Sequence, residues 1–390
     1  MKMIENGIVT VRSKSELKEF IDLPFRLYGE NRFPCWVPPL KLEMRERLDR
    51  RKNPFFEYSE GEYFLFRRNG RTLGRITAGV NRRYIEKFQT PTGFFGFFDC
   101  EDDLEAASAL FGAAEEWLRE RGMKEILGPF NFSTNEEGGV LLKGFDRTPM
   151  VMMPYNPEYV PPLLEGCGLA KKKELWAWYV QKDTVLLSDR LKSFVERVEG
   201  RGDITIRSIA MGRRFKDDLD KIRVVYNEAW KDNWGFVPFT DREIDALGKS
   251  LKPVLDPDLF YIAEERGEPV AFIAGVRDVN KVFYKIKGRL FPFGLFRLLF
   301  GISRVKEMRV AVMGVRPAYR RRGLDAVLYY KVISSAISKG IVASEMSWIL
   351  DDNHGMNNIL HNLRASRYKV YGLFGKSLIP EEETLGTPSP

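Results

Sequence analysis

The chain has 390 residues, of which 44% are hydrophobic and 30% are charged, and this globular composition excludes a wholly disordered protein and favours two domains. Its net charge of +8 indicates an anionic partner, such as a nucleic acid, an anionic membrane surface or a phosphorylated cofactor. Three cysteines without a pairing pattern and only two histidines leave almost nothing to build a metal site, so we expect no metal and a reducing, intracellular protein.

The first half of the chain predicts a series of alternating strands and helices. It begins with two strands around the Asn-Gly turn at residues 69–70, which is a strong hairpin signal. A helix follows an aromatic strand, because apolar residues from Leu104 to Leu118 recur at helical spacing and Gly122 supplies the stop. The hairpin, strand, helix, second strand and final helix–strand pair correspond to residues 62–81, 93–100, 103–122, 125–133 and 158–180.

The second half of the chain repeats this order of elements. The corresponding residues are 259–280, 308–315, 323–340, 343–353 and 356–378. An internal duplication is the economical explanation, and it predicts an α/β (α+β) protein with two tandem domains, each a mixed, mostly antiparallel sheet flanked by helices. The first domain would span residues 1–182 and the second residues 203–378, with a charged linker over 183–202 and a disordered tail over 379–390.

The sharpest chemical signal lies at residues 308–332. An apolar strand ends at Val315, Pro317 breaks it, three arginines follow, and Gly323 opens a helix. The free N–H groups and the positive dipole end of such a helix attract an anion, and the arginines add charge where a diphosphate would lie. Between a strand and a helix, an anion site is a better interpretation of these arginines than a solvated basic turn.

The pattern VxPxYRxRGxxxxL in this segment resembles the acyl-CoA loop of the GNAT acyltransferases. In that family the loop binds the pyrophosphate of coenzyme A, while the preceding strand binds the pantetheine arm and polarises the thioester carbonyl. The resemblance implies two tandem GNAT-like domains and cofactor contacts from Val312, Met313, Gly314, Val315, Arg320, Arg321, Arg322, Gly323, Leu324, Asp325, Ala326 and Asn358. Asp325 departs from the family pattern, which usually has a second Gly or Ala there, and its carboxylate would oppose a nearby phosphate.

The first half resembles the GNAT family by architecture alone. Its corresponding loop, residues 97–108, is acidic where the loop of the second half is basic. We therefore expect the first half not to bind coenzyme A. Tandem GNAT proteins with one working half are a familiar arrangement, in which the silent half usually helps to form the acceptor cleft.

The resemblance implies direct attack of an amine on the thioester, with backbone N–H groups around Met313 and Gly314 stabilising the oxyanion. A base must first remove a proton from the ammonium group. The candidate bases are Glu345, Asp351, Asp352, His354 and His361. Capping of the next helix is an equally good interpretation of the two aspartates, and His361 also fits a surface histidine. The tyrosine that many GNAT enzymes use as an acid has no counterpart, because Leu363 occupies its position.

Two segments are candidates for binding the amine acceptor. Residues 233–240 form an aromatic loop that borders the acceptor pocket in GNAT enzymes, and a packed aromatic lid is the alternative. Residues 128–139 place polar side chains after a buried strand, where they form a structured turn or orient a polar head group. The candidate acceptor contacts are Trp234, Phe236, Asn131, Ser133 and Asn135.

Residues 287–306 interrupt the second half with a short apolar stretch that has basic residues at both ends. The stretch is shorter than the roughly 20 apolar residues that span a bilayer, but its composition suits the interface of a membrane. A buried insertion or a dimer contact is the alternative. With no signal peptide recognised in the first residues, we expect a cytoplasmic protein, peripheral on the inner face of the cell membrane.

The function predicted from these features is acyl-CoA-dependent N-acylation of an amine. The whole chain resembles the family that includes the bacterial ceramide synthases, which implies a long-chain acyl group and a sphingoid base or other lipid amine. An acetyltransferase for small molecules or proteins and a catalytically dead binding protein are the alternatives. Binding of nucleic acid is not expected, because the sequence contains none of the usual recognition motifs.

Overall fold

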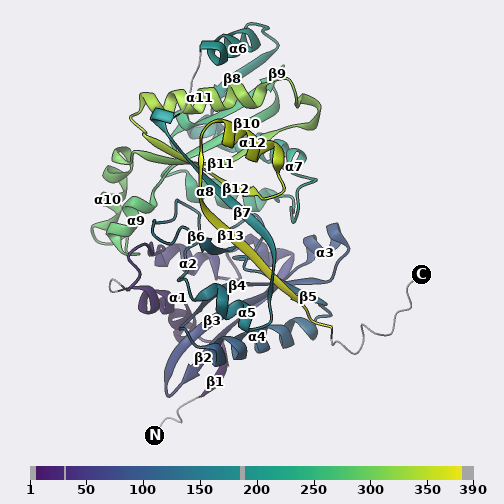
Figure 1. Ribbon diagram of the computed structural model, residues 1–390, viewed down its shortest axis with the longest axis vertical. Helices are drawn as coiled ribbons and strands as arrows, with labels where there is room; N and C mark the ends of the chain where they lie inside the picture. Colours follow the sequence, from purple (N-terminus) through teal and green to yellow (C-terminus); the bar gives the residue numbers. More distant parts are fainter. Residues whose placement is uncertain (1–5, 30–31, 185–188, 380–390) are drawn as a thin grey trace, which may run out of the picture. The chain divides into compact units, whose positions relative to one another are not determined.

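A computed structural model of the chain describes residues 6–29, 32–184 and 189–379 (Figure 1). The chain divides into two compact units, which we call the first unit (residues 1–175 and 369–390) and the second unit (residues 176–368). The predicted tail over 380–390 and residues 185–188 of the predicted linker lie outside the described residues.

The first unit contains strands in the order β1-β2-β3-β4-β5-β13, with β6 beside β13. Their bounds are β1 Gly7–Thr10, β2 Ser59–Arg68, β3 Arg71–Asn81, β4 Thr92–Cys100, β5 Glu125–Gly128, β6 Val140–Lys143 and β13 Ser366–Ser377. The neighbours pair antiparallel except β4 and β5, which pair parallel. The sequence pattern assigned β13 to the second half, but from Lys369 onwards the strand belongs to the first unit, because it bonds to β5 and β6.

The helices of the first unit cover both faces of its sheet. Their bounds are α1 Lys14–Tyr28, α2 Lys41–Arg47, α3 Arg82–Phe88, α4 Leu104–Arg119 and α5 Val160–Gly166. Phe64 and Phe66 of β2 pack in the cluster that contains α4, whereas the alternate residues Tyr63 and Leu65 pack in the cluster that contains α1. Because successive side chains of a strand point to opposite faces, α1 and α4 lie on opposite sides of the sheet.

The second unit contains strands in the order β7-β12-β11-β10-β9-β8. Their bounds are β7 Ala170–Gln181, β8 Ile204–Ser208, β9 Phe260–Glu265, β10 Glu268–Arg277, β11 Glu307–Val315 and β12 Ala343–Leu350, and the change of unit falls within β7. Strands β8 to β11 pair antiparallel, while β11 and β12 pair parallel.

The helices of the second unit also cover both faces. Their bounds are α6 Asp189–Glu199, α7 Phe215–Ala229, α8 Asp241–Leu251, α9 Asn280–Ile286, α10 Gly294–Gly301, α11 Leu324–Ser338 and α12 His354–Asn362. A short 3-10 turn lies at Pro54–Glu57 in the first unit. In the second unit such turns lie at Lys182–Thr184, Gly212–Arg214, Pro257–Leu259, Ile302–Arg304 and Pro317–Tyr319. Ile273 of β10 packs with α11 and Phe272 packs with α7, so these two helices lie on opposite faces. The predicted fold class is confirmed in both units.

The two units share an irregular strand at the same place in the order of elements. In β4, Gly96 pairs with Thr77 and Asp99 pairs with Arg75, so β4 carries one extra residue. In β11 the residue Ala311 has no partner, because its two neighbours pair with consecutive residues of β10. Such a bulge bends a strand. In each unit the parallel neighbour pairs with only the beginning of the bulged strand.

None of the helices within the described ranges is both long enough and apolar enough to cross a lipid bilayer.

Candidate functional site

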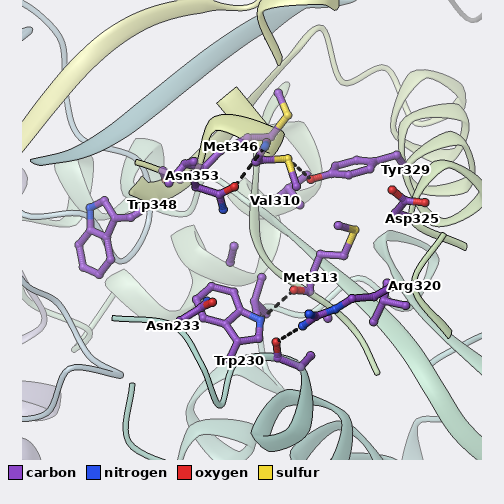
Figure 2. Close-up of a pocket in the computed structure, with 18 of the residues that line it drawn as sticks. Trp230, Asn233, Val310, Met313, Arg320, Asp325, Tyr329, Met346, Trp348 and Asn353 are labelled. Carbon is purple, nitrogen blue, oxygen red and sulfur yellow. Dashed lines mark hydrogen bonds between the residues drawn. The ribbon is translucent and has the colours of Figure 1, made fainter. Parts of the chain in front are cut away.

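A cavity of about 320 Å³ lies in the second unit, where β11 and β12 part (Figure 2). The pairing of the two strands ends at Val310 and Met346, so the edge of β11 beyond Val310 faces the cavity instead of a strand. The wall comes from residues 310–315 of β11, residues 346–349 of β12, the end of α7, the loop after β11 and the starts of α11 and α12. The predicted cofactor strand, Val312 to Val315, therefore lies along one wall.

The loop between β11 and α11 forms the basic end of this cavity. Arg320 and Arg321 both line it, and the Arg320 guanidinium donates a hydrogen bond of 2.7 Å to the carbonyl oxygen of Ala229. Helix α11 begins after Gly323, which has φ of +81° and supplies no side-chain cap to the first turn. The positive end of the helix dipole and two guanidinium groups thus meet at one place, an arrangement that favours an anion.

Other residues of the predicted cofactor loop do not line the cavity. Arg322 turns to Glu265, with 3.4 Å between the charged atoms, and its guanidinium lies 4.6 Å from the ring centre of Tyr319. Leu324 is buried in the core instead, and neither Gly323 nor Ala326 belongs to the wall. The left-handed conformation of Arg321 (φ of 64°) separates the directions of the neighbouring arginines, which the sequence alone does not predict.

Asp325 lies on the cavity wall in the first turn of α11, so the acidic residue that departs from the GNAT pattern does face the site. One turn further along the helix, Tyr329 also lines the cavity, and its hydroxyl donates to the sulfur of Met356 at 3.7 Å. Burial, and secondarily the Asp325 carboxylate, raise the pKa of Tyr329 well above its ordinary value. Sequence reasoning missed Tyr329, although its helical spacing from Asp325 places the two on one face.

The end of α7 closes the cavity opposite α11. Trp230 donates a hydrogen bond of 3.0 Å from its indole nitrogen to the carbonyl oxygen of Met313 (Figure 2). Its ring also stacks on Tyr226. The aromatic loop over 233–240 is fixed to α7, because the side chain of Asn227 bonds to the backbone N–H and carbonyl of Phe239 at 2.8 and 3.1 Å.

The aromatic loop contributes a different residue to the wall from those predicted. Asn233 and the preceding Trp230 line the cavity, whereas Trp234 and Phe236 do not. Trp234 is 39% exposed, and Phe236 is buried against the ring of Tyr226. Their predicted contact with the acceptor stays a prediction.

A buried polar network lies beneath the cavity floor. Glu345 is 0% exposed and does not line the cavity, but the hydroxyl of Ser347, which does, donates a hydrogen bond to its carboxylate. Arg309 donates from Nε to the Ser347 hydroxyl at 2.8 Å and lies 3.6 Å from the Glu345 carboxylate. The Tyr368 hydroxyl donates to the second carboxylate oxygen. Among the predicted bases, Glu345 is connected to the cavity through the Ser347 hydroxyl.

The other predicted bases lie away from the cavity wall. Asp351, Asp352, His354 and His361 do not line it, and neither does Asn358, which is exposed on α12. Asn353 performs the capping expected of the aspartates, since its side chain accepts from the N–H of Met356 at 3.2 Å, and Asn353 itself lines the cavity. Within the described ranges, no group of three or more His, Cys, Asp or Glu side chains is arranged to hold a metal ion.

In the first unit, the edge of β4 is covered by the chain that follows β5. The N–H of Phe130 donates to the carbonyl of Phe95, and the Asn131 side-chain oxygen accepts from the N–H of Phe97, both at 2.8 Å. A Cβ atom placed on Gly96 would lie 1.9 Å from the carbonyl oxygen of Phe130, which shows how closely the two segments approach.

The remaining predicted acceptor residues of the first unit make local contacts. The Ser133 hydroxyl accepts from the N–H of Asn135 at 3.1 Å, which is the structured turn considered as the alternative. The N-terminus of α4 is capped by Asp103, whose carboxylate accepts from the N–H of Ala106 at 2.9 Å. A role for Asn131, Ser133 and Asn135 in binding an acceptor stays a prediction.

Comparison with known proteins finds relatives over nearly the whole chain. Residues 219–361 match the model of the acetyltransferase (GNAT) family. The chain is 38% identical over 379 residues to Protein YghO of Escherichia coli (strain K12), covering 95% of this chain and 96% of that protein. It is 36% identical over 379 residues to the bacterial ceramide synthase of Caulobacter vibrioides (strain NA1000 / CB15N), covering 95% and 97%. A tandem GNAT protein from the clavulanic acid biosynthesis pathway has a similar fold, with a TM-score of 0.57, 12% identity and coverage of 97% and 100%.

Proposed function

Because the chain belongs to the GNAT family of acyltransferases, and within it to the tandem GNAT relatives of the bacterial ceramide synthase, we propose that it transfers an acyl group from a coenzyme A thioester to an amine. The observation that carries the proposal is the open edge of β11 leading to the uncapped N-terminus of α11. An extended pantetheine arm needs backbone partners, and a diphosphate needs N–H groups and positive charge.

The acyl-CoA would lie along β11 and end at the loop before α11. The backbone of Val312–Val315 would bind the pantetheine arm, and Arg320, Arg321 and the first turn of α11 would bind the pyrophosphate. The left-handed glycine at the start of α11 favours this arrangement because the helix begins there without a side-chain cap on its first N–H groups. Asp325 would lie beside the pyrophosphate and lower the affinity for it, which the two arginines offset.

The proposed chemistry uses groups on the cavity wall. Backbone N–H groups around Met313 and Gly314 would stabilise the tetrahedral oxyanion. The acceptor ammonium would give a proton to the Ser347 hydroxyl as that hydroxyl passes its own proton to Glu345, and the resulting amine would attack the thioester carbonyl. The departing thiolate would take the proton of the Tyr329 hydroxyl, which lies on the cavity wall.

A long-chain acyl group and a sphingoid base or similar lipid amine are the proposed substrates. The support is the 36% identity to a protein named bacterial ceramide synthase over nearly its full length. Transfer of an acetyl group to a small molecule or protein is the second candidate, favoured by the match to the acetyltransferase model.

Thermal unfolding with acetyl-CoA and with palmitoyl-CoA tests the cofactor and its acyl chain. Both thioesters should raise the midpoint of the wild type, and a larger shift with palmitoyl-CoA would favour the lipid substrate. Arg321→Glu should abolish the shift, because it reverses a charge on the cavity wall. The matched control is Arg322→Glu, whose side chain is turned to Glu265, and it should keep most of the shift. No shift in the wild type would mean that the fold has lost its cofactor.

A further inference from the structure

The segment between β10 and β11 carries an exposed apolar surface, which we call the α10 surface (Phe291, Phe293, Leu295, Phe296, Leu299 and Phe300). Six of the fifteen large hydrophobic side chains that are exposed in the described part of the chain lie within residues 291–300. Phe291 is 73% exposed, and Phe293 and Phe300 are each 69% exposed. An exposed cluster of this kind marks an interaction site, since isolated apolar residues are the norm on protein surfaces.

Helix α10 uses its other face to pack on the protein. Gly294 and Leu298 are buried, and a Cβ atom on Gly301 would lie 3.2 Å from the side chain of Val282 in α9. The face that carries Gly294, Leu298 and Gly301 is thus turned to the protein, and the other large apolar side chains of this segment are exposed. This is the reverse of an ordinary surface helix, whose apolar stripe faces the core. Figure 1 shows α9 and α10 side by side in the second unit.

The charge around the α10 surface has one sign. Residues 279–306 contain seven basic residues and no acidic residue. Lys281 pairs with Glu307 at 3.3 Å, whereas the other six form no ion pair with any residue that the structure describes. They are Lys285, Lys287, Arg289, Arg297, Arg304 and Lys306. All six are exposed, so their positive charge is available to an anionic partner.

We propose that α9 and α10 form a membrane-docking element, in which the α10 surface enters the interface of an anionic lipid bilayer and the six basic residues bind lipid head groups. Aromatic and leucine side chains with basic flanks are the composition of helices that lie in a membrane interface. A symmetric contact with a second copy is disfavoured, because an isologous interface would bring Arg297 and its basic neighbours against the same groups of the other copy.

This inference rests on the proposed function, because docking matters most to an enzyme whose acceptor amine resides in a bilayer. The docking element joins directly to β11, at the end opposite the cofactor loop: the insertion ends at Lys306, the strand starts at Glu307, and the loop with Arg320 follows its other end. A lipid bilayer at the α10 surface would therefore leave the basic end of the cavity to the soluble cofactor.

Co-sedimentation with vesicles tests the docking element. The full-length protein should bind vesicles of phosphatidylcholine and phosphatidylglycerol, bind phosphatidylcholine alone much more weakly, and lose binding as salt rises. The variant Phe293→Ser/Phe296→Ser/Phe300→Ser should bind the anionic vesicles at least about tenfold more weakly. The matched control, Leu42→Ser/Leu104→Ser/Ile359→Ser, changes three exposed apolar residues elsewhere and should bind like the wild type.

Two readouts separate this inference from the proposed function. Stabilisation by acetyl-CoA should be the same in the wild type and the triple Phe variant, which also shows that the variant is folded. The docking element would be overturned if both triple variants bound vesicles like the wild type, or if both lost binding equally. Neither outcome would affect the proposed cofactor site. A wild-type dimer that binds no vesicles and that the triple Phe variant converts to a monomer would also overturn it, in favour of a contact between two copies.

Discussion

The bulged strand β4 of the first unit and the bulged strand β11 of the second have the same local geometry, but the edge of β4 is covered and the edge of β11 is open. Each is followed by a loop and a helix, and each loses its parallel neighbour partway along. Beside β4 the chain itself fills the vacated edge, with Asn131 bonding to the backbone of Phe97. Beside β11 the edge lines a cavity. The fold alone therefore does not create the cavity. Whether one forms depends on whether a following segment of the chain occupies the gap between the two strands.

The helices after these strands differ in the same sense. The first turn of α4 is satisfied by the carboxylate of Asp103, which also pairs with Arg68 at 2.6 Å. The first turn of α11 follows three arginines and a glycine and has no side-chain cap. At the N-terminus of α4 a carboxylate of the protein takes the place where an external anion would bind. At the N-terminus of α11 no side chain takes that place.

The largest expected effect comes from the hydroxyl that connects the cavity of the second unit to Glu345. Ser347→Ala should lower kcat by about 10²–10⁴-fold, because it removes the proposed path for the ammonium proton, with little change in the KM for acyl-CoA. The decline of kcat should be largest below the pKa of the amine, where a base is needed most. Ser133→Ala in the first unit is the control, since that hydroxyl serves a turn. Full turnover by Ser347→Ala would remove Ser347 and Glu345 from the mechanism.

A second effect concerns the glycine that opens α11. Gly323→Ala should lower the free energy of unfolding by about 2–4 kcal/mol, because the backbone is left-handed and the added Cβ would lie 2.3 Å from Phe194. Gly122→Ala has a similar φ of +75° with nothing within 4 Å, so we expect a loss of only about 1 kcal/mol. Denaturant unfolding of both variants measures the difference. Equal losses would mean that contact with Phe194 does not constrain the loop.

A third effect tests whether Asn131 stabilises the segment that covers the edge of β4. Asn131→Ala leaves the buried N–H of Phe97 without its partner and should cost about 1–3 kcal/mol of stability. The affinity of the folded variant for acyl-CoA, measured by calorimetry, should equal that of the wild type. A large loss of turnover by a stable, folded Asn131→Ala protein would instead favour the predicted contact with the acceptor.

The smallest effect is at the cap of α4. Asp103→Ala should cost about 1 kcal/mol at neutral pH. A hydrogen bond from Arg68, followed by one from Ala106, lowers the pKa of Asp103 in the folded protein. Its contribution is therefore present above the unfolded pKa of about 3.9 and is lost as the pH falls through the lower folded value. The stability difference between the wild type and the variant should shrink across that acidic range, and a difference that stays constant would show that the charge of Asp103 plays no part.

Local signals predicted most of the fold. The Asn-Gly turn at 69–70 gave the hairpin of β2 and β3, and the apolar spacing gave α4. The return of β13 to the first unit was not predictable, because it depends on pairing with β5 and β6, which are far away in the sequence. Local pattern also located the loop before α11 that lines the cavity, since its arginines and its glycine are consecutive in the sequence.

The individual roles within the site were harder to predict. The direction of Arg322 depends on Glu265, and capping by Asn353 rather than by its acidic neighbours depends on where α12 starts. Asn131 looked like a ligand-binding side chain because polar residues after a strand suit both a site and a turn. Only its contact with Phe97 distinguishes these uses, and that contact joins residues from separate elements.

Hydrogen–deuterium exchange of the full chain with and without acetyl-CoA tests the central claim most directly. Exchange should slow over residues 310–326, where the edge of β11 and the first turn of α11 would gain partners, and should stay unchanged over residues 95–108 of the first unit. Protection of 95–108, or saturating acetyl-CoA without protection of 310–326, would contradict it.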